Sequence, residues 1–186
     1  MINEINPMMF NDPLALKTDW KQCNMLGSNF CSEKLVRTEP NRAEFRSTNG
    51  VLAMYIGFIA VGSAILILSK LSSIEAILFG LMFILIGAGL ILFANKHTVF
   101  DKTTSSFFKG RKKAEKASAI LSNIHAIQLI AKIVRGKKIY YCYELNLVLN
   151  NAERINIISH GNKKRIRADA HTLSEFLAVP VWDAIE

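Results

Sequence analysis

The chain has 186 residues, of which 51% are hydrophobic, and its formal net charge is +8 at pH 7. Its basic residues are not interleaved with exposed aromatic residues and match no recognition motif, so the charge does not indicate a nucleic-acid-binding protein. The three cysteines Cys23, Cys31 and Cys142 are odd in number, lack CxxC spacing and have no histidine at zinc-ligand spacing. They argue against a disulfide framework or a zinc site and indicate free thiols in a reducing compartment.

Residues 1–50 are predicted to form an N-terminal segment with little regular structure. The first 35 residues include Pro7 and Pro13 and show no clear periodicity, so we expect them to be irregular and folded back onto the later part of the chain. Within 34–47, two short polar–apolar runs flank a Pro-Asn pair, which marks a turn. This pattern predicts a β-hairpin that leads into the apolar region.

Two apolar runs follow, over 51–69 and 74–94, and only four residues separate them. The first has no charge, and the second has only Glu75 at its start, where a helix dipole favours a carboxylate. At about 1.5 Å per residue, each run spans the roughly 30 Å core of a bilayer, where backbone groups require helices. Buried helices of soluble proteins rarely run this long without charge, and a signal peptide normally lies nearer the N-terminus. We therefore predict a transmembrane helical hairpin over 51–94.

Small residues predict how the two helices of this hairpin meet. Helices in lipid pair by close packing at small side chains, although such residues are also common in transmembrane helices generally. In the first run they recur at spacings of four, three and four, and in the second they recur every seven residues, which favours a packed pair. The predicted packing residues are Ala53, Gly57, Ala60 and Ala64 in the first helix and Gly80, Gly87 and Ala94 in the second.

The charge distribution predicts the orientation of the hairpin. Residues 1–50 carry six Lys or Arg and six Asp or Glu, whereas residues 95–186 carry 16 and 8. The loop between the apolar runs contains only Lys70. By the positive-inside rule we expect both termini in the cytoplasm and the hairpin in a bacterial inner membrane. The run Arg111, Lys112 and Lys113 either contacts anionic lipid headgroups or is a plain topology signal in a solvated loop.

Residues 95–186 are predicted to form a cytosolic antiparallel β-meander with a C-terminal helix. Along 139–150, alternation places Tyr141 and Leu145 on a buried face and Glu144 and Asn146 on a solvated one. The predicted strands cover 97–102, 105–109, 124–134, 139–150 and 154–160.

The pattern changes to a helical period over 163–177, where an apolar stripe is expected to pack on the sheet. Lys163, Lys164 and Arg165 begin this helix, where the dipole disfavours positive charge. They form either a surface that contacts anions or a partner, or an ordinary solvated basic face.

This layout resembles small bacterial membrane proteins that carry a pleckstrin-homology-like (PH-like) domain, and more distantly the photosystem I assembly factor of chloroplasts and cyanobacteria. The second likeness is carried by an FDK-type strand, here Phe100-Asp101-Lys102, and by a helix ending in FL-x-VP, here Phe176-Leu177-Ala178-Val179-Pro180. In architecture the resemblance covers residues 51–180. It implies a non-enzymatic, membrane-tethered interaction domain, such as an assembly factor or accessory subunit.

The sequence gives little indication of catalysis. The histidines are scattered, and the chain contains no GxSxG, GxGxxG, Walker or HExxH motif. We therefore expect no enzyme and predict no catalytic residue, cofactor or metal ligand. His160 and Asp169, near the junction of sheet and helix, would be the candidates for an activity.

Together these features predict a non-enzymatic inner-membrane interaction protein, an accessory subunit or an assembly or scaffold factor, that presents a cytosolic domain to a protein partner. Two alternatives stay open. One is an immunity-type protein that neutralises a toxin at the membrane, and the other is a module that binds anionic lipid.

Overall fold

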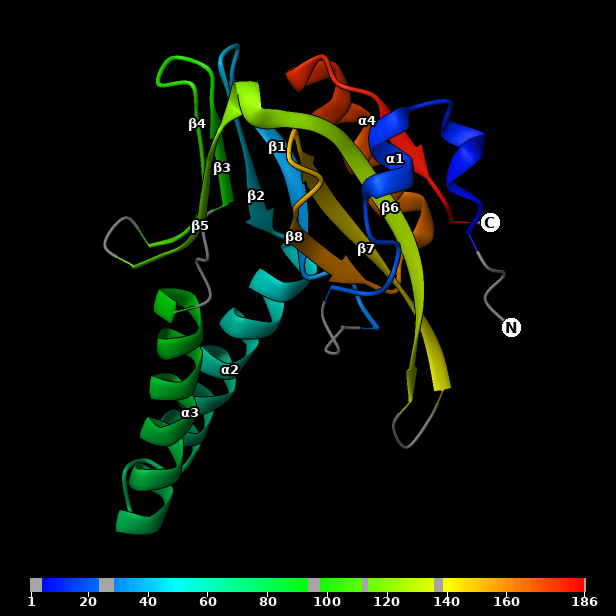
Figure 1. Ribbon diagram of the computed structural model, residues 1–186. Helices are drawn as coiled ribbons and strands as arrows, with labels where there is room; N and C mark the ends of the chain where they lie inside the picture. The colour runs from blue at the N-terminus through cyan, green and yellow to red at the C-terminus, as the bar shows by residue number, and fades with distance from the viewer. Residues whose placement is uncertain (1–4, 24–28, 94–97, 112–113, 136–138, 186) are drawn as a thin grey trace. The chain divides into compact units, whose positions relative to one another are not determined.

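A computed structural model describes residues 5–23, 29–93, 98–111, 114–135 and 139–185 (Figure 1). The chain divides into two compact units, one of Met1–Arg46 with His97–Glu186 and one of Ser47–Lys96. The first unit is therefore discontinuous in sequence. The separate domains predicted over 1–50 and 95–186 belong together, because strands from both build one sheet.

This first sheet has five strands in the order β1-β2-β3-β4-β5. Its strands are β1 Glu33–Glu39, β2 Arg42–Ser47, β3 Thr98–Asp101, β4 Ser106–Arg111 and β5 Ala114–Ile120. The strands β1 and β2 match the hairpin predicted over 34–47, and β2 pairs antiparallel with β3, with Phe45 opposite Thr98. The sequence does not predict β5, because its run AEKASAI is poor in the β-branched and aromatic residues typical of strands.

A second sheet has four strands in the order β8-β7-β6-β9. They are β6 Ile124–Arg135, β7 Ile139–Leu149, β8 Arg154–His160 and β9 Val181–Asp183. The short β9, which the sequence does not predict, pairs parallel with β6 and places Val181 opposite Ile127. The single meander expected from the sequence is therefore divided between two sheets, and one edge strand is parallel.

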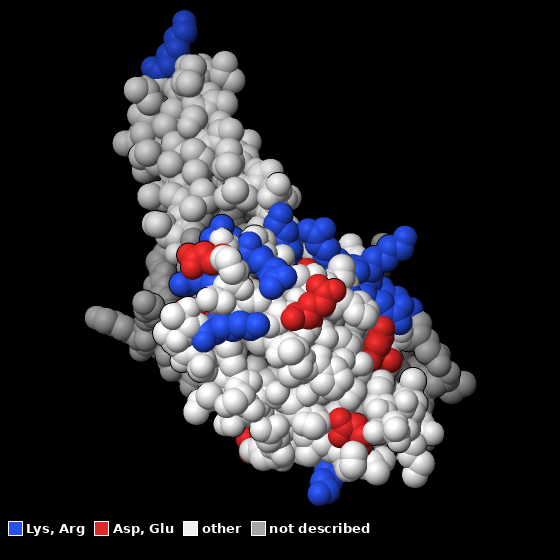
Figure 2. Space-filling view, turned by 90° about the horizontal axis from the view of Figure 1, so that it is seen from above, with Lys and Arg blue, Asp and Glu red and all other residues white. Residues whose placement is uncertain are grey.

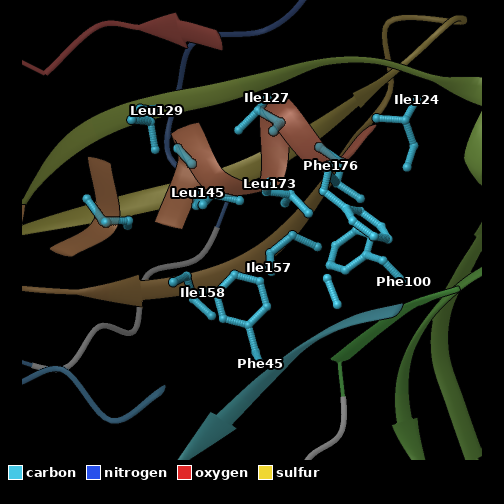
Figure 3. Packing of buried hydrophobic residues seen from close by; sticks show 14 of the residues in the cluster. Phe45, Phe100, Ile124, Ile127, Leu129, Leu145, Ile157, Ile158, Leu173 and Phe176 are labelled. Carbon is cyan, nitrogen blue, oxygen red and sulfur yellow. The ribbon is translucent and has the colours of Figure 1, made fainter. Parts of the chain in front are cut away.

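The helix α4, Lys163–Leu177, has the predicted bounds. It begins where the Asn162 side chain accepts a hydrogen bond from the Arg165 amide, and it ends at Ala178 in the left-handed conformation. Its buried apolar side chains join residues of both sheets in one core, where Leu173 and Phe176 approach Ile127 and Phe100 (Figure 3). Burying each such side chain contributes about 1.5–3 kcal/mol, so α4 helps to hold the two sheets together.

The second sheet is covered on both faces, which corrects the expectation of one solvated face. Leu145 lies in the core beside α4, and Glu144 and Asn146 on the opposite face are also 0% exposed. The N-terminal segment lies over that opposite face, as a fold-back predicts, although it contains the short helices η1 Pro7–Phe10 and α1 Pro13–Lys17. The predicted burial of Tyr141 is wrong, since its exposed fraction is 52%.

The second unit consists of α2 Asn49–Leu68 and α3 Ile74–Phe93, within two residues of the predicted bounds. Both helices are long and apolar enough to cross a membrane. They pack against each other through glycines. A methyl group on Gly87 would lie 2.8 Å from the Tyr55 carbonyl oxygen, and one on Gly62 would lie 2.5 Å from that of Gly80.

The packing face predicted for the first helix is wrong. Ala53, Ala60 and Ala64 are exposed, and a methyl group added at Gly57 would have no neighbouring atom within 4 Å. The contact with α3 instead runs through Gly62 and the neighbouring side chains Ile59 and Leu66. Of the predicted residues of the second helix, Gly80 and Gly87 lie at the contact, whereas Ala94 lies outside the described residues.

We predict that Gly62→Leu destabilises the helix pair and that Gly57→Leu on the same helix does not. Overpacking a tight contact typically costs about 1–3 kcal/mol, whereas open space accepts the larger side chain. Energy transfer between dyes attached at Leu52 and Leu92, followed during SDS titration in mixed micelles, measures the separation of the helices. Equal midpoints for the two variants would contradict the assigned contact.

Candidate functional site

The basic residues singled out from the sequence lie on different elements. Lys164 and Arg165 are exposed on the first turn of α4, and Lys163 is half-buried beside them. Arg111 ends β4, whereas its side chain and the whole of Lys112 and Lys113 lie outside the described residues. The structure therefore places one of the two predicted basic groups on an accessible surface.

Two further cations, which the sequence analysis missed, cover the ring of Phe176. The Arg37 Cζ atom lies 5.4 Å and the Lys102 Nζ atom 4.7 Å from the ring centroid, both within cation–π range. These residues come from β1 and from the turn after β3, so only the folded sheet brings them to α4. Lys and Arg side chains gather over part of the face shown in Figure 2, with Asp and Glu side chains among them.

A cysteine, a histidine and an aspartate gather near the start of α4. The Cys31 Sγ atom lies 3.6 Å from Nε2 of His160, and the Asp169 carboxylate influences the Cys31 thiol electrostatically. His160 Nδ1 accepts a hydrogen bond from the Asn162 amide at 3.2 Å, which places the proton of a neutral ring on Nε2. His160 and Asp169, the catalytic candidates from the sequence, are therefore both in this cluster.

The electrostatics of the cluster disfavour a nucleophile. Burial, and then the Arg165 charge, lower the pKa of His160 to about 4, while burial and Asp169 raise the pKa of the Cys31 thiol. Cys31 also donates to the Glu33 carbonyl at 3.0 Å. At neutral pH these influences favour a neutral thiol beside a neutral ring, whereas an activated pair needs a thiolate.

Asp169 is the unusual member of the cluster. Its exposed fraction is 6%, Oδ1 accepts from the Leu35 amide at 3.3 Å, and Oδ2 has no hydrogen-bond partner within the described part of the chain. Burial raises its pKa to about 6. At neutral pH the buried, ionised carboxylate therefore destabilises the folded state.

The outer face of the second sheet holds a buried ion pair. Lys132 Nζ lies 2.7 Å from Glu144 Oε1, with side-chain exposures of 2% and 0%. The backbone amide of Cys23 donates to the other Glu144 oxygen at 2.9 Å. Such a pair is stable only when the remaining polar atoms are also satisfied, and here the N-terminal segment supplies a donor.

Polar side chains extend this layer across β6, β7 and β8. Asn146 donates to Gln128 at 3.2 Å, and Asn156 donates to Asn146 at 2.9 Å. Arg154 donates to the same Gln128 oxygen at 3.1 Å. Alternation in the sequence predicts Asn146 on the face opposite the apolar one, but it wrongly leaves that face in solvent and does not predict that a distant segment covers it.

Within the part of the chain that the structure describes, no three His, Cys, Asp or Glu side chains are grouped so that they could hold a metal ion. No protein-family model matches the chain, and no curated protein matches it in sequence.

Replacing Lys132 alone should strongly destabilise the first unit. Lys132→Met leaves Glu144 buried without a counter-charge, which typically costs about 3–5 kcal/mol. The double variant Lys132→Met/Glu144→Gln removes both charges and should recover at least half of that loss. Chemical denaturation measures the free energy of unfolding, and Lys164→Met on the surface serves as the control. A single variant as stable as that control would show that the pair is not buried.

The raised pKa of Asp169 predicts a pH-dependent effect of Asp169→Asn. The carboxyl binds its proton more tightly in the folded chain, so its contribution is most favourable below pH 3.8 and is lost as the pH rises through about 6. The variant should therefore be more stable than wild type by up to about 3 kcal/mol near pH 7.5. This difference should shrink near pH 4.5, and a constant difference in the free energy of unfolding would contradict the assignment.

Proposed function

We propose that this chain is a non-enzymatic interaction protein of the bacterial inner membrane. In this proposal α2 and α3 span the bilayer as a hairpin, and the β-rich first unit acts in the cytoplasm as a PH-like domain. That unit would bind a protein partner, and the chain would serve as an accessory subunit or as an assembly or scaffold factor.

The observation that carries the proposal is the apolar surface of the two helices. Leu68, Leu78 and Leu85 expose 81%, 63% and 70% of their surface, and only 11% of the most apolar stretch of each helix is buried. Exposed apolar surface of this extent is unfavourable in water and typical of contact with lipid or with another apolar surface. Two helices of 20 residues, each about 30 Å long, fit the thickness of a bilayer core.

The charges support the proposed orientation. Lys70 is the charged residue of the turn between the helices, whereas 16 Lys and Arg follow the second apolar run. Basic residues stay preferentially on the cytoplasmic side. The proposal therefore places both Met1 and Glu186 in the cytoplasm.

The described side chains support binding rather than catalysis. The Cys31–His160 pair is held in a form that is unfavourable for a nucleophile. In architecture, two sheets closed by the C-terminal helix α4 are compatible with the PH-like interaction domain that the sequence resembles. The described part of the chain presents exposed basic side chains at the start of α4 and a Cys31–His160 pair that is not activated, which suits a binding module.

A second candidate function is binding of anionic lipid, and a specific observation favours it. Arg37 and Lys102 are exposed and lie over Phe176, and Lys164 and Arg165 are exposed at the start of α4. Each basic side chain near an anionic surface contributes about 1 kcal/mol. This function is compatible with a membrane anchor and does not exclude a protein partner.

Reporter fusions test the proposed topology. A reporter that is active only in the periplasm should be silent when fused after Glu186 and active when inserted between Leu71 and Ser72. A cytoplasmic reporter at the same two sites should give the opposite pattern, and it controls for expression. Periplasmic activity at Glu186 would overturn the orientation, and periplasmic inactivity at both sites would overturn the membrane span.

A further inference from the structure

The N-terminal segment 5–23, here called the strap, is attached to the second sheet mainly through side chains. Its described backbone–backbone hydrogen bonds stay within the strap, such as those from Ala15 to Asp12 and from Thr18 to Leu14. Its polar links to the sheet are made instead by Gln128 and Arg154, which donate to the Asp19 and Lys21 carbonyls, and by Glu144, which accepts from the Cys23 amide. A segment without a strand ladder is among the less stable parts of a fold and can detach locally.

The ionic contacts of the strap pair its acids with bases on the sheet. Asp12 lies 2.8 Å from His125, and Asp19 lies 3.1 Å from Arg154. The Asp19 side chain is 59% exposed, whereas that of Arg154 is only 9% exposed. The sheet therefore supplies one largely buried cation, the Arg154 guanidinium, and the strap supplies its accessible partner, the Asp19 carboxylate.

An aromatic contact completes the attachment. The ring of Trp20 lies 5.9 Å from Trp182 of β9 and stacks on Phe10 at 5.0 Å. Trp182 is 2% exposed, and it packs with Ala126 and Val148 against Ala15 of the strap. An apolar centre with polar contacts beside it resembles a small protein interface, in which buried aromatic residues supply most of the binding energy.

The polar layer beneath the strap has the composition of a solvated or binding surface. Gln128, Lys132, Asn146 and Arg154 are the kinds of side chain that an outward-facing strand usually carries in water. Asn146 and Arg154 both donate to Gln128, and Lys132 pairs with Glu144, so these side chains keep internal partners when the strap leaves.

We propose that the outer face of β6, β7 and β8 is a peptide-binding surface that the strap occupies in cis. The same face takes a short segment with aspartates and an aromatic residue, like those of the strap, from a protein partner. The ion pair with Arg154, the contact of His125 with a carboxylate and the aromatic contact of Trp182 define that chemistry. The inference deepens the proposed function, and it rests on that function for one point, that the partner is a protein. The apparent affinity for such a segment equals the intrinsic affinity of the face multiplied by the fraction of time that the strap is detached.

The test measures binding of a fluorescein-labelled peptide, FNDPLALKTDWK, which copies residues 10–21, to the full chain in detergent micelles. Asp12→Asn/Trp20→Ala weakens the strap and leaves the sheet intact. Asp19→Asn, at an exposed side chain, is a milder second variant if the first does not fold. The control peptide replaces both aspartates by Asn and the tryptophan by Ala, and Arg154→Gln in the weakened background removes a cation from the face.

The peptide should bind the strap-weakened chain at least about tenfold more tightly than wild type, because the competitor in cis is weakened. The milder variant should lie between the two, and the control peptide and Arg154→Gln should both weaken binding. Equal affinity for wild type and both strap variants, or no binding to a folded strap-weakened chain, would overturn the proposal. If the wild-type chain forms a dimer that free peptide dissociates, the occupant of the face is a second copy of the chain. That result would contradict the proposal of a separate protein partner. Since the assay is done in detergent, its failure leaves the membrane topology untouched.

Discussion

The pairing of β2 with β3 is the constraint on which the rest of this structure depends. Phe45 lies opposite Thr98 and Arg42 opposite Asp101, although the unit Ser47–Lys96 separates the two strands in sequence. Lengthening a connection costs little, about 0.6 kcal/mol for each doubling, provided that its ends return to the same place. Two antiparallel helices joined by a short turn meet that condition. The sheet thus requires an inserted unit that returns to its starting point, and the close glycine contacts between α2 and α3 suit a preformed pair of this kind.

The two faces of the second sheet are covered in different ways. One face packs on α4 and is apolar, and the other holds an ion pair and a chain of amides beneath the N-terminal strap. A buried polar layer adds little to stability compared with an apolar one, so its retention agrees with a surface that also has to exist uncovered. The cluster of Cys31, His160 and Asp169, by contrast, is disfavoured as a reactive site by its own electrostatics.

The features that local pattern determines were predictable from the sequence. The bounds of α2 and α3 follow from the length of the apolar runs, and those of α4 from its helical period. The features that depend on distant contacts were not. β5 and β9 have weak local signals and form because neighbouring strands present open edges. Glu144 was expected in solvent. Alternation shows that its side chain faces away from the core, but it does not show that the strap covers that side chain. The helix contact at Gly62 was missed because small residues occur on several faces of α2.

The central claim is that α2 and α3 are held in a lipid bilayer and anchor the β-rich unit there. Extraction of membranes with alkaline carbonate tests this claim most directly, because it releases proteins bound only through charge or through partners and retains those that span the bilayer. The account predicts that the full chain stays in the membrane pellet, as an integral control protein does. Recovery of the chain in the supernatant, together with a peripheral control protein, would contradict it.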